Sequence, residues 1–196
     1  MSRLSKLTEE VNALYKAKHS NRANWADWLF ENHIFVVAQK AGDLADRFGA
    51  QKELCKAAAL LHDIADTKML RENEKHDEES ATIAQQLLQQ ADFTLEEINI
   101  IIDDAIAMHG CKRGQVPQTL EGKVMASADA LAHLQTDFYI HAVKAFQSEG
   151  KPIQEIRNWV LSKIERDYRD KMFFDEIRSE VTTHYKKLKA YINQLE

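Results

Sequence analysis

The sequence predicts an all-α protein. Only 6 Gly and 2 Pro occur among its 196 residues, so few positions interrupt a helix. Runs in which apolar and polar residues alternate, which are typical of strands, are nearly absent. Apolar side chains instead recur three and four residues apart, as on one face of an amphipathic helix. A chain of this length is within the range of one domain, and we expect residues 1–196 to form a single compact unit.

The first third of the chain divides into three predicted helices. Apolar residues at helical spacing define the first over residues 4–18 and a longer second helix over residues 25–48. Gly49 is a suitable end for the second helix, because glycine readily adopts the left-handed conformation found after helices. A third helix is expected over residues 51–64.

The rest of the chain is predicted to be helical as well. Residues 67–79 are highly charged and are expected to form either a solvated loop or a rim that faces a ligand. Thr94-Leu95-Glu96-Glu97 fits a capping box, which marks a helix start. The predicted helices cover residues 77–90, 94 to near 109, 118–133 and, in two or three segments, 137–196.

Composition excludes several classes of function. The formal net charge of −5 argues against a general nucleic-acid binder, which normally presents a basic face. Cys55 and Cys111 follow no metal or disulfide pattern, so we predict free thiols in a reducing compartment. The N-terminus lacks the apolar run of a signal peptide, and no stretch is long enough to span a bilayer. We expect a cytoplasmic protein with no membrane partner.

One short stretch concentrates the chemistry. The small and apolar run 57–61 leads into His62 and Asp63, and Asp66 and Lys68 follow. Burying an imidazole or a carboxylate without a partner is costly, and one metal ion would satisfy His62 and Asp63 together. On a continuous helix Asp66 would share a face with both residues. The alternative is a buried His–Asp pair that only stabilises the helix.

Three further positions stand out. Asp129 is embedded among Ala, Ser and Leu, where an isolated carboxylate needs a cation, a metal or several hydrogen bonds. His33 lies beside the apolar stripe of the second helix, where a lone histidine is more often structural than a ligand. His133 is either a support for Asp129 or a surface residue, and we favour the surface.

The order His33, His62-Asp63, Asp129, each on a different predicted helix, resembles the HD-domain metal-dependent phosphohydrolase superfamily. The resemblance covers roughly residues 25–134, which would form the metal-site core of a compact helical bundle. Residues 135–196 would add a C-terminal helical extension. Within the superfamily, the motif His-Asp-Ile-x-Asp-x-Lys looks most like small stand-alone bacterial hydrolases, some of which act on nucleotides.

The resemblance implies a role for each residue. His33, His62, Asp63 and Asp129 would bind one divalent transition metal, and Asp66 would act as general base or orient the attacking water. Lys68 and Arg71 would neutralise the charge of a phosphate. His109 and His76 resemble the extra histidines of two-metal members. However, His76 follows Asp63 more closely than that arrangement suggests, so we assign both to substrate and prefer one metal.

Two imidazoles and two carboxylates favour manganese, with iron, cobalt, nickel, zinc or magnesium as alternatives. The predicted function is metal-dependent hydrolysis of a small phosphate substrate, a nucleotide, with release of phosphate or pyrophosphate. The alternatives are a two-metal cyclic-dinucleotide or dinucleotide hydrolase, a di-iron oxygenase, a non-catalytic nucleotide-binding regulatory module and a purely structural helical protein. A homodimer through the amphipathic C-terminal helices is also plausible.

Overall fold

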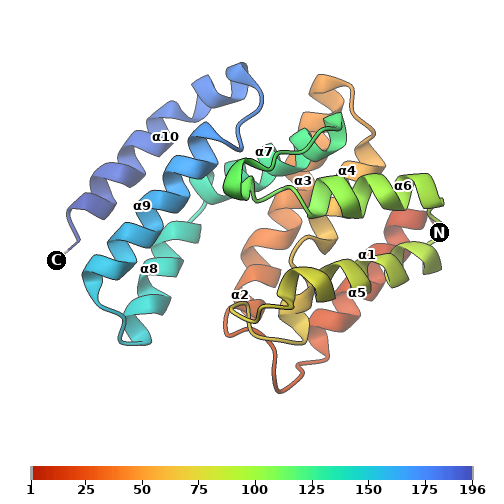
Figure 1. The fold of residues 1–196 in the computed structure, drawn as a ribbon, viewed down its shortest axis with the longest axis horizontal. Coiled ribbons are helices and arrows are strands. Elements are labelled where there is room, and N and C mark those ends of the chain that lie inside the picture. The colour runs from red at the N-terminus through yellow and green to blue at the C-terminus, as the bar shows by residue number, and fades with distance from the viewer. Residues whose placement is uncertain (1, 196) are drawn as a thin grey trace.

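The computed structural model describes residues 2–195, apart from the side chain of Arg113, and confirms the all-α prediction (Figure 1). Every regular element within that range is a helix or a helical turn. The elements up to the charged loop are α1 (Arg3–Lys16), α2 (Ala26–Leu29), η1 (Phe30–Ile34), α3 (Phe35–Phe48), α4 (Lys52–Leu61) and η2 (Ile64–Thr67). The elements that follow are α5 (His76–Gln90), α6 (Leu95–Asn99), η3 (Ile100–Ile106), η4 (Lys112–Gly114), α7 (Leu120–Gln135), α8 (Phe138–Ser148), α9 (Ile153–Arg169) and α10 (Asp175–Asn193).

The core is formed where α3, α4, α7 and η3 pack on one another. Small side chains make this packing close, as in the buried alanines 57–59 of α4 and the buried alanines 126, 128, 130 and 132 of α7. Nearly every residue of α7 is buried, which is the behaviour of a central helix that has neighbours on all sides. The polar residues of α4 and α7 therefore lie inside the molecule and must find partners there.

The predicted helix over residues 25–48 forms as a chain of three segments. α2 passes into the π-helical turn η1, which continues directly into α3. Such wide turns insert an extra residue into a helix and often occur at functional sites. The helix ends where predicted, because Gly49 adopts the left-handed conformation with φ of 78°.

The predicted helix over residues 51–64 is wrong at its C-terminal end. α4 stops at Leu61, and Asp63, with φ of −122°, leaves the helical conformation. The chain then makes the 3₁₀ turn η2, which carries Asp66. Asp66 therefore does not continue the helical face of His62, although the turn still brings it to the same region.

The capping box predicted at Thr94 is confirmed: the Thr94 side chain accepts from the Glu97 backbone and the Glu97 side chain accepts from the Thr94 backbone. The helix it starts becomes π-helical over η3 before it ends ahead of His109. Cys55 and Cys111 are both free thiols, as predicted.

The C-terminal helices form a separate layer against the core. α9 lies against α7, α8 and α10, and α10 also contacts α7 (Figure 1). Ser127 of α7 fixes the turn between α9 and α10, since its hydroxyl donates to the carbonyl of Lys171 at 2.9 Å and accepts from the amide of Phe173 at 3.1 Å. This turn thereby brings residues of the extension into the centre of the protein.

Within residues 2–195, no helix is both long and apolar enough to cross a bilayer.

Candidate metal centre

His62 has its tautomer fixed by the end of α4. Its Nδ1 lies 2.8 Å from the carbonyl oxygen of Ala59, and because a carbonyl can only accept, Nδ1 must donate. In the neutral imidazole, Nε2 then carries a lone pair. This atom lies 3.4 Å from Oδ2 of Asp63 and 3.8 Å from Oδ1 of Asp129, both acceptors. A lone pair directed at two carboxylates needs either a proton or a cation between them.

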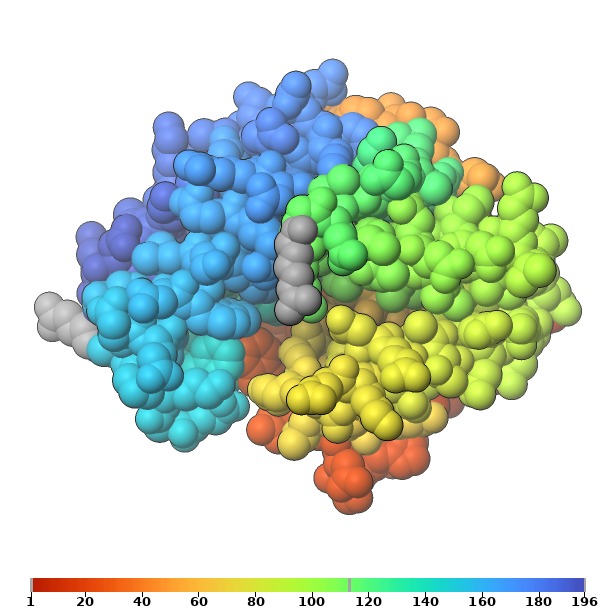
Figure 2. Space-filling view, viewed as in Figure 1, coloured from red at the N-terminus to blue at the C-terminus, as the bar shows by residue number. Residues whose placement is uncertain are grey.

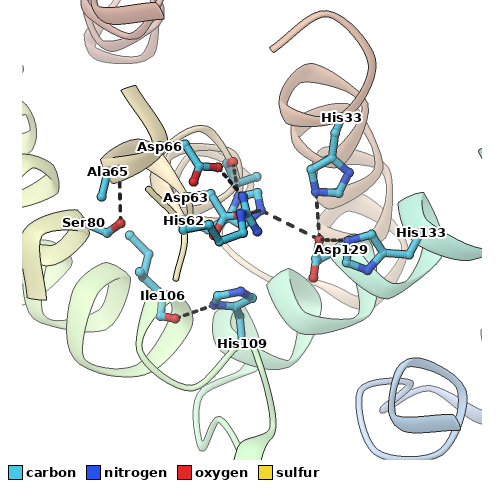
Figure 3. Close-up of polar contacts among 12 residues, drawn as sticks. His33, His62, Asp63, Ala65, Asp66, Ser80, Ile106, His109, Asp129 and His133 are labelled. Carbon is cyan, nitrogen blue, oxygen red and sulfur yellow. Dashed lines mark hydrogen bonds and ion pairs between the residues drawn. The ribbon is translucent and has the colours of Figure 1, made fainter. Parts of the chain in front are cut away.

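His33 and Asp129 approach the same point from two other helices (Figure 3). The π-turn η1 directs His33 inward, where its Nε2 lies 3.1 Å from Oδ1 of Asp129. Both side chains are almost fully buried, with 1% and 3% of their surface exposed. Asp129 is a buried residue in the middle of α7.

The ligand atoms of His33, His62 and Asp129 lie within 4.8 Å of one another, which makes them a group able to hold a metal ion. Nε2 of His62 and Oδ1 of Asp129 are buried and meet no described residue in good hydrogen-bond geometry, although Nε2 of His33 and of His133 approach Oδ1 to 3.1 Å and 3.3 Å. Buried polar atoms without partners are rare. Adjacent ligands of an octahedral ion with bonds of about 2.1 Å lie roughly 3 Å apart. The His33–Asp129 separation of 3.1 Å matches this value, and the His62–Asp129 separation of 3.8 Å is wider. The residues therefore fit a divalent transition metal.

Asp63 lies at the edge of this group and is shared with Arg71. Its Oδ2 accepts from Nη2 of Arg71 at 2.8 Å, and the same guanidinium nitrogen also contacts Oδ2 of Asp66. Burial alone would raise the pKa of Asp63, but the charge of Arg71 holds that pKa well below its usual value. The carboxylate is thus ionised and available beside His62.

Asp66 is fully buried and held from two sides. Besides Arg71, it accepts from Nε2 of His76 at 2.9 Å. Burial disfavours the charged form of His76, but its hydrogen bonds to Asp66 and Asp77 outweigh that effect and raise its pKa to about 9. His76 is only 6% exposed, so it lies behind Asp66 and not on an open rim.

The charged side chains of segment 67–79 therefore take different positions. Arg71 turns inward onto the two carboxylates, His76 is buried, and Lys68 remains exposed. Asp63 and Asp66 attract the guanidinium and the imidazole, so Arg71 and His76 face these carboxylates while Lys68 points to solvent. Their roles toward a substrate stay predictions.

His109 packs against the ring of His62. The two ring centroids are 5.3 Å apart, and Nδ1 of His109 lies 2.6 Å from the carbonyl oxygen of Ile106, to which it donates (Figure 3). Its Nε2 is consequently the acceptor end. Burial and the charge of Lys171 lower its pKa to about 4, so His109 is neutral at pH 7. Together with His62 it lines a cavity of about 260 Å³ between α5 and η3.

Four side chains gather around Asp129, and sequence reasoning named only one of them, His133; the other three are Lys163, Asp167 and Lys171. His133 is 4% exposed, so our preference for a surface position is wrong; its Nε2 lies 3.3 Å from Oδ1 of Asp129. Nδ1 of His133 donates to Asp167 at 2.9 Å, and Lys171 donates to the second oxygen of Asp129. Lys163 lies 3.7 Å from Asp167 and completes the cluster.

This cluster supplies the positive charge that a buried carboxylate requires. Burial disfavours the charged form of Asp129, yet His133 and Lys171 hold its pKa well below the ordinary value. Lys171 is the cation of this pair, because burial lowers the pKa of His133 to about 3. Three of the four residues lie in α9 or just after it, more than 30 positions along the chain. The only local signal was the spacing of Asp129 and His133, which places them on one helical face.

The sequence model of the HD domain matches residues 30–134, which is more than half of the chain. The chain is a member of the HD-domain family. Searches of curated proteins and of solved structures find no significant match. The matched segment begins at η1 and ends within α7, so the HD domain contains all three residues of the metal-binding group.

The HD domain supports a general statement of function. Members of its superfamily are generally metal-dependent hydrolases of phosphate esters, and the grouped His33, His62 and Asp129 agree with a metal site in this member. The helices after residue 134 lie outside the matched segment. Through Lys171 and Asp167 they nevertheless surround the HD-domain carboxylate Asp129.

Proposed function

We propose that this HD-domain protein is a metal-dependent phosphohydrolase that acts on nucleotides. The observation that carries the proposal is the pair of unpartnered atoms, Nε2 of His62 and Oδ1 of Asp129, aimed at one point together with His33. Asp63 would complete a set of two imidazoles and two carboxylates. That set favours manganese, with iron, cobalt, nickel or zinc as alternatives.

When bound, the ion would polarise a phosphoryl oxygen and lower the pKa of a bound water. The protein would contribute the orientation of both reactants. His62 is held by Ala59, and Asp129 is held by Lys171, so their ligand atoms need no rearrangement. Such fixed second contacts orient metal ligands and raise their affinity.

Asp66 is our candidate for the residue that orients or deprotonates the attacking water. It shares Arg71 with the ligand Asp63, which places its carboxylate next to the proposed centre. His76 and Arg71 both hydrogen-bond to its carboxylate and fix its orientation. Arg71 is 37% exposed and could also bind a phosphate, because a guanidinium has several donors. Lys68 and His109 stay candidates for contacts to the substrate.

The test is release of phosphate and pyrophosphate from a panel of nucleotides. Metal-stripped protein is resupplied with manganese, cobalt, nickel, magnesium or zinc, with Asp63→Ala alongside. We expect metal-dependent release that Asp63→Ala abolishes, and the product reveals which bond is cleaved. No release with any ion, despite tight metal binding, would contradict the proposal and favour a non-catalytic nucleotide-binding module.

A further inference from the structure

A large cavity lies beside the metal centre, between the HD domain and the C-terminal helices. It has a volume of about 460 Å³, which is in the range of small-molecule sites. Figure 2 shows the hollow between α8 and α9, in cyan, and the loop around residue 71, in yellow. Residues 23–25 form its base.

Four aromatic side chains line this cavity: Trp25, Phe138, Phe146 and Trp159. They form a connected group, because the ring of Phe146 lies 5.2 Å from that of Trp25 and 4.9 Å from that of Trp159. Trp25 and Phe138 are 6.3 Å apart. Trp159 is 43% exposed although it is a large apolar residue, so much of its ring surface is open to a ligand. Such a group offers flat surfaces to a planar ring.

The inner end of the cavity lies next to the metal centre, although none of the proposed metal ligands lines it. Arg71 lines the cavity and also contacts Asp63 and Asp66. Phe138 lines it too, and its ring lies 5.4 Å from the ring of His33. One molecule can therefore contact the aromatic group while its other end lies at the proposed metal.

Charge changes along the α9 wall. Glu155, Trp159 and Lys163 share one face of α9, and Glu155 and Lys163 are about 12 Å apart along the helix axis. Lys163 is at the inner end, where it lies 3.3 Å from Nδ1 of His133. Cationic Lys163 and Arg71 thus flank the metal end, and the uncharged ring of Trp159 lies further out. This order matches a ligand with an anionic group at one end and an aromatic ring at the other.

We propose that this cavity binds the base of the nucleotide, with the ring stacked against Trp159 and Trp25 and the phosphates directed past Arg71 to the metal. The C-terminal helices α8 and α9, which lie outside the HD-domain match, would thereby select substrates that carry a flat aromatic group. The proposal rests on the proposed function for the position of the phosphates, but the aromatic group carries the ring-binding step by itself.

The cavity next to His109 is a weaker candidate for the base. It is smaller, at about 260 Å³, and its apolar lining comes from aliphatic side chains such as Ile102 and Met108. Apart from His62 and His109, it offers no aromatic surface among its lining residues. It therefore provides a control position at Met108.

Tryptophan fluorescence tests ring binding without turnover. Two of the three tryptophans line the cavity, and the third, Trp28, is stacked on His141 with ring centroids 4.1 Å apart. We expect ATP, CTP and the other nucleoside triphosphates to quench the emission of metal-stripped protein, whereas inorganic tripolyphosphate does not. Trp28→Phe should keep the quenching. Trp159→Ala should weaken nucleotide binding about tenfold, the scale of one lost stacking contact.

The kinetic arm separates this proposal from the proposed function. With metal present, Trp159→Ala should raise KM for nucleotides about tenfold with little change in kcat. Trp159→Phe should restore most of the affinity, and Met108→Ala should leave KM unchanged. Hydrolysis of tripolyphosphate, which has no ring, should not respond to Trp159→Ala.

Two outcomes separate the base site from the hydrolase activity, because each refutes only one of them. Turnover of nucleotides with a KM unaffected by Trp159→Ala and no quenching would refute the base site but keep the hydrolase. Quenching that is lost in Trp159→Ala, together with no turnover under any metal, would support the base site and refute the hydrolase.

Discussion

At the scale of single residues, the site is defined by which nitrogen of each histidine carries the proton. Ala59 and Ile106 each offer a carbonyl to Nδ1 of a histidine, so Nε2 of both His62 and His109 faces the site as a lone pair. His133 is oriented in the same way by Asp167. The backbone at the ends of α4 and η3 thus orients both rings with Nε2 toward the site.

Asp66 provides the first test at this scale. Asp66→Asn keeps the shape of the side chain but removes its charge and its basicity. We expect turnover to fall by about 100-fold or more, the range for loss of a general base. Metal content serves as the control and should change far less, whereas the free energy of unfolding should fall because the variant loses the charged pairs with His76 and Arg71. Turnover within a few-fold of the wild type would remove Asp66 from the mechanism.

His76 predicts a pH dependence of stability. Its pKa is raised to about 9 in the folded protein, against an ordinary value of 6.5. The charged pair with Asp66 therefore contributes fully to stability below about pH 6.5, and the contribution is lost as the pH rises through about 9. Chemical denaturation of the wild type and His76→Gln should differ most at pH 6 and least near pH 10. A difference that does not change with pH would contradict the assignment.

At the scale of elements, close packing at its N-terminal end fixes the position of α7, and with it the position of Asp129. A Cβ atom at Gly122 would lie 2.3 Å from Oδ2 of Asp104 and 2.6 Å from Cβ of Pro117. That carboxylate accepts from the amides of Gln118 and Thr119 at the start of α7. The glycine is needed because Asp104 approaches the first turn of the helix.

Gly122→Ala should consequently destabilise the protein by about 1–3 kcal/mol, as overpacking does. Gly42→Ala is the matched control in α3, since the nearest atom there is Cδ of the flexible Lys56 side chain at 3.2 Å. That change should be neutral or stabilising by up to about 1 kcal/mol. Equal effects of the two substitutions in urea unfolding would show that the approach of Asp104 is not restrictive.

Sequence patterns predicted the elements well where the determinants are local. The stop at Gly49 and the capping box at Thr94 depend on a few neighbouring residues, and both formed as expected. The predicted end of α4 was wrong. The chain leaves the helix at Asp63, and the turn that follows places Asp66 in contact with Arg71. The contact of Lys171 with Asp129 joins residues 42 positions apart, and no local pattern encodes it.

At the scale of the whole molecule, the C-terminal helices complete the interior of the HD domain. Lys171 is 2% exposed and lies between Asp129 and Asp167, so it neutralises two buried carboxylates at once. The extension is therefore part of the folding unit that contains the proposed metal centre, in addition to forming one wall of the aromatic cavity.

Lys171→Met tests this dependence. Loss of the ammonium leaves buried carboxylates without their cation, and we expect a loss of about 3–5 kcal/mol in the free energy of unfolding. Lys189→Met is the control, because Lys189 pairs with Glu165 at the surface and should cost less than about 1 kcal/mol. A similar small effect at both positions would mean that the extension does not support the core.

The most direct test of the account is the number of metal ions bound per chain. Metal-stripped protein is loaded with manganese, freed of excess by gel filtration and analysed for metal content, together with His62→Ala and Asp129→Ala. We predict one ion per chain for the wild type and none for either variant, because the two substitutions remove the unpartnered atoms at the centre of the group. Two ions per chain, or unchanged metal in the variants, would contradict a single centre built on His33, His62 and Asp129.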